Sequence, residues 1–174
     1  MKKKALVMTV PRSGTHFLLR FLVGVLGLDG DSSLATVSKE TNCDFSHIHP
    51  TSAQMKRYKA SEIFDACIIT LRHPFKSGQS MKMVGEKIEY VRDYWDALLE
   101  EQKNYNKTLF LVIDGPEEER FPQLMAIAEY FGKEHLEDAI REYAEDWTPQ
   151  NQSMTDEDRE IMDFAVRAYE QWQS

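Results

Sequence analysis

The sequence predicts an α/β fold, a single three-layer α/β/α domain over residues 1–174 with a mostly parallel central sheet. Four apolar runs of strand length alternate with segments whose apolar residues recur at helical spacing. Two of the runs, A-C-I-I-T-L and T-L-F-L-V-I, are nearly continuous, which is typical of parallel strands covered on both faces. At 174 residues and 42% hydrophobic content, the chain can bury a core of its own. No linker or repeat divides it, so the alternation indicates one domain.

In the first half of the chain, strands are expected over 4–10, 44–49 and 63–71, and helices over 14–28, after Thr51 or Ser52, and over 75–86. Each strand ends at Pro11, Pro50 or the turn Arg72-His73-Pro74, because proline has no N–H for a strand ladder. The middle strand alternates as D-F-S-H-I-H, and a hydroxyl side chain caps the helix after it. Residues 28–33 resemble a loop, and residues 34–43 fit neither pattern.

In the second half, we expect a helix over 88–104, a strand over 108–113, a helix ended by Gly132, a helix over 134–144 and a last helix that begins at Thr155. Ile88, Val91 and Trp95 recur at helical spacing in the first of these. Asp-Gly-Pro closes the strand, and Gly132 provides a C-terminal cap. Thr155-Asp-Glu-Asp is typical of a helix start, and a loop around Trp147 precedes it.

Charge and cysteine content narrow the functional class. The net charge is −8, which argues against a nucleic-acid partner held by bulk electrostatics. Residues 1–87 carry 13 Lys or Arg and 7 Asp or Glu, so the basic residues gather in the first half. Pro11, Arg12 and Arg20 interrupt the first apolar segment, so no membrane span is expected. Two cysteines and no clean signal peptide favour a cytoplasmic protein.

Anion-binding residues follow two of the predicted strands. The segment P-R-S-G-T follows the first strand. It places a cation (Arg12), two hydroxyl side chains (Ser13 and Thr15) and Gly14 at the expected N-terminus of a helix. After the third comes Arg72, with Ser80 about two turns into the next helix. Because parallel strands end at one edge of a sheet, one ligand with two phosphate-like groups could occupy both places. Taken singly, Arg12 could be a surface arginine and Arg72 the partner of a carboxylate.

Other phosphate-binding motifs do not match. A Walker A loop needs G-x-x-x-x-G-K-[ST], and no glycine precedes Gly14 at that distance. The G-x-G-x-x-G fingerprint is also missing. A cysteine phosphatase loop would place its arginine six residues after the cysteine, whereas Cys67 and Arg72 are five apart. Cys67 is therefore interpreted as a buried core residue.

Two motifs together resemble a known family. P-R-S-G-T-H-F resembles the 5′-phosphosulfate loop of sulfotransferases that use 3′-phosphoadenosine 5′-phosphosulfate (PAPS), and L-R-H-P-F-K-S-G-Q-S resembles their 3′-phosphate motif. More loosely, residues 109–132 resemble the strand, loop and helix that end in a Phe-Leu-Gly-like triplet. The resemblance implies a P-loop-like first strand, loop and helix, PAPS as donor, 3′-phosphoadenosine 5′-phosphate (PAP) as product, and no metal.

The same resemblance assigns roles to individual residues. Arg12 matches the loop lysine at the sulfuryl group and the leaving phosphate oxygen, although arginine cannot act there as a proton donor. The residues that match donors to the 5′-phosphate are Ser13, Gly14, Thr15 and His16. Phe17 matches the aromatic residue that stacks on adenine, but it could equally be core. Arg72 and Ser80 match the 3′-phosphate ligands.

The family commonly uses a histidine as general base, in a setting like T-H-x-P. This chain has S-H-I-H-P, where Ser46-His47 matches the Thr-His pair and His49 lies closer to the proline. We prefer His47, leave His49 open, and expect His73 to be structural. Two polar histidines with no catalytic part are the simpler alternative.

The predicted function is sulfuryl transfer from PAPS to a hydroxyl or amine of a small-molecule or carbohydrate acceptor. The family's C-terminal Arg-Lys-Gly segment has no match here, and the acceptor and oligomeric state stay open. The alternatives are a nucleotide or small-molecule kinase with a degenerate phosphate loop, and a nucleotide-binding module without catalysis.

Overall fold

The structure, a computed structural model, describes residues 3–31, 42–85, 87–147, 167 and 170. Its strands are β1 (Ala5–Thr9), β2 (Gly30–Asp31), β3 (Phe45–Ile48), β4 (Ala66–Leu71) and β5 (Thr108–Val112). Its α-helices are α1 (Thr15–Arg20), α2 (Ser52–Tyr58), α3 (Pro74–Met83), α4 (Val91–Glu101), α5 (Glu117–Tyr130) and α6 (Glu137–Glu145). The expected helix beginning at Thr155 lies outside the described residues.

The five strands form one parallel sheet in the order β2-β3-β1-β4-β5. β1 lies in the middle, with Val7 opposite both His47 and Ile68 and with Thr9 opposite Thr70. Every strand therefore ends at the same edge, and the segments that follow β1, β3, β4 and β5 meet there.

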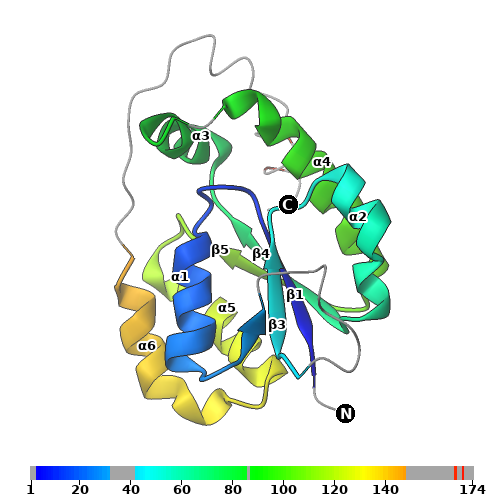
Figure 1. Cartoon of the computed structure of the whole chain (residues 1–174). Coiled ribbons are helices and arrows are strands. Elements are labelled where there is room, and N and C mark those ends of the chain that lie inside the picture. The colour runs from blue at the N-terminus through cyan, green and yellow to red at the C-terminus, as the bar shows by residue number, and fades with distance from the viewer. Residues whose placement is uncertain (1–2, 32–41, 86, 148–166, 168–169, 171–174) are drawn as a thin grey trace.

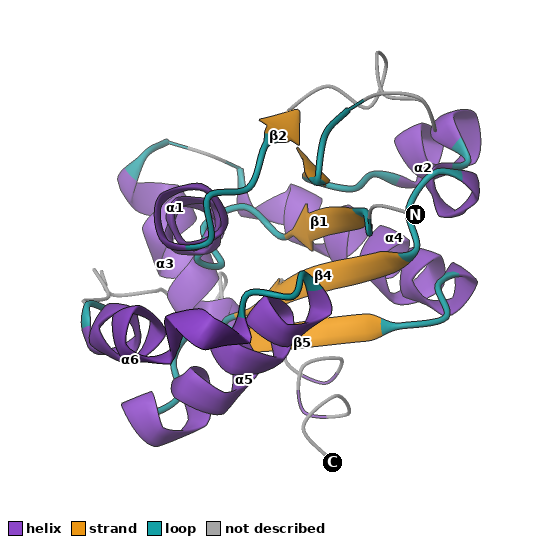
Figure 2. Cartoon of the chain, turned by 90° about the horizontal axis from the view of Figure 1, so that it is seen from below, coloured by secondary structure: helices purple, strands orange, loops and turns teal. Residues whose placement is uncertain are grey.

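Helices cover both faces of the sheet (Figures 1 and 2). On one face, Leu6 and Met8 of β1 pack in a cluster with Trp95 and Leu98 of α4, and α2 and α3 contribute to the same cluster. On the other face, Val7 of β1 packs with residues of α1, α5 and α6. The alternation of side chains along β1 supplies both clusters. The predicted three-layer α/β/α fold with a mostly parallel sheet is confirmed.

The first predicted helix is confirmed as far as Val25, but its second half is π-helical and it ends before Leu28. α1 ends at Arg20, and a π-helical turn over Phe21–Val25 follows, in which the Leu26 N–H donates to the Phe21 carbonyl at 3.1 Å. Gly24 lies in this turn and Gly27, with φ of 64°, follows it. Glycine weakens the α-helical preference, so the regular helix cannot continue to Leu28.

Two smaller expectations are also wrong. The segment expected as a loop over 28–33 contains β2, where Gly30 lies so close to Phe45 that a Cβ would be 2.4 Å from the ring. The third strand begins at Ala66 instead of residue 63, because a 3₁₀ turn over Ala60–Glu62 precedes it.

The predicted caps at Thr51 and Gly132 are confirmed. Thr51 caps α2 in a capping box with Gln54. After α5, Gly132 adopts φ of 70° and the Lys133 N–H donates to the Ala128 carbonyl at 2.9 Å. No helix in the described part of the chain is both long and apolar enough to cross a membrane.

Candidate anion-binding and catalytic site

The loop between β1 and α1 is held in an unusual backbone conformation. Arg12 has φ of 64° and Gly14 has φ of 93°, both in the left-handed region. A Cβ at position 14 would be 2.4 Å from Cγ1 of Ile113, a residue that follows β5. Gly14 is therefore required both by its backbone angle and by the close approach of its neighbour.

Ser13 stabilises this loop through hydrogen bonds inside the protein. Its hydroxyl donates to the Val10 carbonyl at 2.7 Å and lies 2.8 Å from the Thr70 hydroxyl of β4, and its N–H also bonds the Val10 carbonyl. Ser13 is 1% exposed. Both of its polar groups are thus used inside the protein, and the structure does not bring Ser13 to the cavity described below.

The first turn of α1 is open to a ligand. Gly14 precedes α1, which has no side-chain cap. Within the described residues, the N–H groups of Thr15 and His16 have no backbone acceptor. Such groups carry the positive end of the helix dipole, so this turn can accept an anion.

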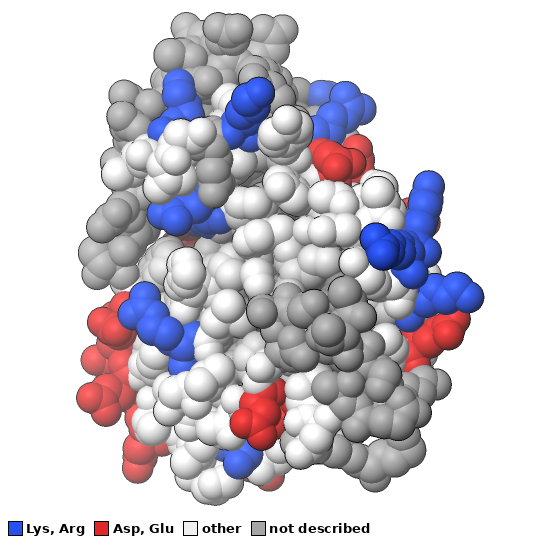
Figure 3. Space-filling view, in the orientation of Figure 1, with Lys and Arg blue, Asp and Glu red and all other residues white. Residues whose placement is uncertain are grey.

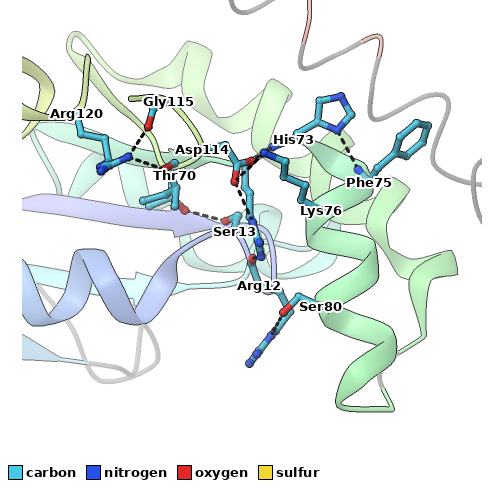
Figure 4. Close-up of polar contacts among 12 residues, drawn as sticks. Arg12, Ser13, Thr70, His73, Phe75, Lys76, Ser80, Asp114, Gly115 and Arg120 are labelled. Atoms are coloured by element: carbon cyan, nitrogen blue, oxygen red, sulfur yellow. Dashed lines mark hydrogen bonds and ion pairs between the residues drawn. The ribbon is translucent and has the colours of Figure 1, made fainter. Parts of the chain in front are cut away.

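Arg72 links the end of β4 to the loop. Its Nη1 donates to the Arg12 carbonyl at 3.1 Å, and its Nε lies 3.4 Å from Oδ1 of Asp114, which follows β5. Asp114 also accepts a hydrogen bond of 2.8 Å from the His73 N–H (Figure 4). Burial lowers the pKa of the Arg72 guanidinium, while Asp114 raises it. The sequence left open whether Arg72 pairs with a carboxylate, and in the structure it does.

The two predicted phosphate motifs touch each other. Arg12 Nε donates to the Ser80 hydroxyl of α3 at 3.0 Å (Figure 4). His73, expected to be structural, caps α3 by accepting from the Phe75 N–H at 3.3 Å. Ser80 lies in the same helix, on the side that contacts Arg12. A charged side chain and a hydroxyl from segments 68 residues apart therefore meet at one place.

Both candidate bases lie around Thr9, the last residue of β1. The Thr9 hydroxyl lies 2.9 Å from His47 Nε2, 3.1 Å from His49 Nδ1 and 2.8 Å from the Thr15 hydroxyl. The two imidazole rings meet edge to face at 4.8 Å. Burial, followed by the neighbouring His49 and His16, lowers the pKa of His47 to about 4. His47 is therefore neutral at physiological pH.

These residues surround one cavity of about 380 Å³. Its lining includes every predicted site residue except Ser13, namely Arg12, Gly14, Thr15, His16, Phe17, His47, His49, Arg72 and Ser80. Arg20 and Trp147 also line it. Three arginines and three histidines contribute, and the lining among the described residues contains no carboxylate. Figure 3 shows Lys and Arg atoms beside α1 and α3 at this edge of the sheet.

Phe17 and Trp147 form the aromatic wall of the cavity. Phe17 is 5% exposed and packs against Tyr143 at 4.7 Å and Trp147 at 5.4 Å between ring centroids. The Trp147 ring also lies 5.9 Å from the Arg72 guanidinium. Phe17 is thus largely a core residue, and Trp147 lines the cavity beside it.

Sequence reasoning missed four residues that build the site. They are Thr9, Asp114, Arg120 and Trp147. Arg120, 6% exposed, donates to the Ile113, Gly115 and Ala144 carbonyls, so it ties the end of β5 to the end of α6 before Trp147. Asp114 and Thr9 could have been found as polar residues at strand ends. Arg120 lies inside a helical pattern that gives no such signal.

Comparison with known proteins supports the fold but not a sequence family. Neither protein-family models nor curated protein sequences contain a match to this chain. Among solved structures, the chain is similar to the mouse sulfotransferase SULT7A1 complexed with PAP. The TM-score is 0.65 at 13% identity, over 99% of this chain and 89% of the mouse chain. The chain therefore has the fold of a sulfotransferase, while so low an identity shows the fold alone.

Proposed function

We propose that this protein is a sulfotransferase that moves the sulfuryl group of PAPS to a hydroxyl or amine of a small-molecule or carbohydrate acceptor. The observation that carries the proposal is the shared cavity. It brings the anion-binding loop, the Arg72–Ser80 segment and two histidines together at the carboxyl edge of the sheet. The fold shared with a PAP-bound sulfotransferase supports the same donor.

The residues fit a donor with two separate phosphates. The α1 N-terminus, with Gly14 and Thr15, would hold the 5′ end, because its N–H groups are open and no side chain at position 14 blocks the approach. Arg72 and Ser80 would hold the 3′-phosphate, and His16 borders the same cavity. The adenine ring of the donor would contact Trp147 and the edge of Phe17.

The chain's own groups would promote the transfer in two ways. A histidine at the cavity, His47 or His49, takes the proton of the acceptor group. Arg12 and the open N–H groups of α1 stabilise the negative charge that grows on the leaving 5′-phosphate. One lost donor of this kind typically costs about 100- to 1000-fold in rate. The bound donor supplies the sulfuryl group. Its sulfur forms a bond to the acceptor atom, while its bond to the 5′-phosphate oxygen breaks.

Calorimetry with PAP tests the donor site directly. We expect binding by the wild type and a large loss in Ser80→Ala and Arg72→Ala, with a smaller loss for adenosine 5′-monophosphate because it lacks the 3′-phosphate. Arg92→Ala, an exposed arginine of α4 paired with Asp96, is the matched control and should bind normally. Absence of binding at high micromolar PAP would refute the donor assignment.

Transfer of labelled sulfate from PAPS to a panel of phenols, amines and sugars tests the reaction. Binding without transfer to any acceptor would point to a nucleotide-binding module. Magnesium-dependent turnover of ATP would point instead to a kinase.

A further inference from the structure

Thr9 contacts both candidate bases through two different groups. Its backbone carbonyl lies 2.7 Å from His49 Nδ1. Its hydroxyl lies 2.9 Å from His47 Nε2, 2.8 Å from the Thr15 hydroxyl at the start of α1 and, at the longer distance of 3.1 Å, from His49 Nδ1. Thr9 is fully buried in the central strand, so these groups are held by the sheet. The two histidines are therefore in different hydrogen-bonding situations.

The position of the proton on neutral His49 follows from its partner. A carbonyl oxygen only accepts hydrogen bonds, so Nδ1 of His49 must donate and must carry the proton. A neutral imidazole has one N–H, which leaves Nε2 with a free lone pair. His49 lines the cavity, and Nε2 has no hydrogen-bond partner among the described residues. That nitrogen is available to a substrate.

His47 is not fixed in the same way. Its Nε2 faces a hydroxyl, which can either donate or accept. If the Thr9 hydroxyl donates to Nε2, the lone pair there is already used. If Nε2 donates, the Thr9 hydroxyl turns its proton to Thr15. In both cases Nε2 of His47 is occupied inside the protein, and only in the second case does His47 keep a free lone pair, on Nδ1. Burial also lowers the pKa of His47 to about 4, which makes it a weak base.

We propose that His49 is the proton acceptor of the site and that Thr9 is a positioning residue. Thr9 holds His49 through its backbone carbonyl, and its hydroxyl connects His47 to Thr15 at the start of α1. This inference rests on the proposed function for the reaction it serves. It reverses the preference for His47 that the sequence pattern S-H-I-H-P suggests, because the pattern contains no information on hydrogen-bond partners.

The proton balance of the step is simple. Nε2 of His49 takes the proton of the acceptor hydroxyl, whose oxygen forms a bond to the donor sulfur. The bond from that sulfur to the 5′-phosphate oxygen breaks, and its electron pair stays on the phosphate. The histidine then returns its proton to solvent. The sum is one sulfated acceptor, one PAP and one proton.

The first experiment needs neither ligand nor activity. Long-range ¹H–¹⁵N spectra of the wild type distinguish the two neutral histidine tautomers, with His49→Asn and His47→Gln to assign the signals. We expect the Nδ1–H tautomer for His49. In Thr9→Val, the His49 pattern should stay and the His47 Nε2 signal should move, while Thr9→Ser should restore it. A proton on Nε2 of His49 would overturn the proposal.

The second experiment measures kcat and KM of matched variants. Asparagine places an N–H close to where Nδ1 of His49 was, so His49→Asn keeps the bond to Thr9 but loses the base. We expect its kcat to fall by about 100-fold or more with KM for PAPS unchanged. Glutamine similarly mimics Nε2 and keeps the contact with the Thr9 hydroxyl, so His47→Gln should lose clearly less kcat than His49→Asn.

The Thr9 variants complete the design. Thr9→Val should lower kcat about 10- to 100-fold through misplaced side chains, and Thr9→Ser should recover most of it. A larger loss in His47→Gln than in His49→Asn would overturn the assignment of the base. If no variant and no wild type transfers sulfate while His49 shows the expected tautomer, the sulfotransferase function fails and the proton assignment stands.

Discussion

The most direct test of the packing of the loop between β1 and α1 is Gly14→Ala. The new methyl group would lie 2.4 Å from Cγ1 and 2.7 Å from Cδ1 of Ile113, and position 14 would keep a φ of 93°. Two costs therefore add up. The left-handed backbone costs an alanine about 1–2 kcal/mol. Overpacking against a fully buried side chain costs about 1–3 kcal/mol more.

The expected loss of unfolding free energy is thus about 2–5 kcal/mol, a large part of the 5–15 kcal/mol typical of a domain. Urea denaturation followed by circular dichroism measures it. Gly27→Ala is the matched control, because Gly27 has φ of 64° but no atom within 4 Å of the new Cβ. It should lose only about 1–2 kcal/mol, from backbone strain alone.

A double-mutant cycle isolates the steric part. Ile113→Ala alone should cost about 2–5 kcal/mol through the cavity it leaves. In Gly14→Ala/Ile113→Ala, the new methyl group occupies part of that cavity, so the double variant should be about 1–3 kcal/mol more stable than the sum of the single changes predicts. Equal losses for Gly14→Ala and Gly27→Ala, or strict additivity in the cycle, would refute the contact between the loop and Ile113.

Three further outcomes are expected. Since the pKa of His47 is about 4 in the folded state and 6.5 when unfolded, the unfolded state takes up a proton first as pH falls. Stability should therefore decline between pH 6.5 and 4 by up to roughly 3 kcal/mol, and His47→Gln should lose that part of the slope in urea titrations at each pH. Burial raises the pKa of the Cys67 thiol to about 11. In a variant without Cys43, Cys67 should therefore react with an aromatic disulfide at pH 8 only when the protein unfolds. Fast labelling of the native protein would contradict the burial of Cys67. Arg120→Met should cost about 2–4 kcal/mol and weaken PAP binding, because buried carbonyls lose their donor. Arg141→Met removes an exposed pair with Glu137 and a contact with the Phe121 ring, and should cost no more than about 1 kcal/mol. Equal losses would show that Arg120 does not hold α6.

The fold was largely predictable because its strands carry strong local signals. The runs around Ile68 and Leu111 are apolar on both faces, as buried parallel strands must be, and prolines mark where strands end. The errors arose where tertiary contacts decide. Gly24 and Gly27 lie at the end of the first helix, and Gly30 pairs with Phe45 in an edge strand, where the Phe45 ring leaves no room for a Cβ. No local pattern reports such contacts.

The site was predictable in its charges but not in its hydrogen bonds. Arg12, Arg72 and Ser80 follow strands that end at one edge, so topology alone brings them together. Topology does not predict that the Ser13 hydroxyl contacts the buried Thr70 hydroxyl, or that Asp114 forms an ion pair with Arg72. Those facts depend on side-chain rotamers and on elements far away in the sequence.

The contact between Arg12 and Ser80 has a thermodynamic consequence for any ligand. Arg72 already donates a hydrogen bond to the Arg12 carbonyl, and Arg12 already donates one to the Ser80 hydroxyl. Both guanidinium groups therefore have partners before a ligand binds. A phosphate that binds through Arg12 Nε or Arg72 Nη1 must take the place of the present acceptors, the Ser80 hydroxyl and the Arg12 carbonyl, so these two hydrogen bonds are replaced and none is added there. The gain comes mainly from placing anionic charge among cations that have only one described carboxylate, Asp114, beside them. Affinity that arises from charge in this way decreases as ionic strength rises.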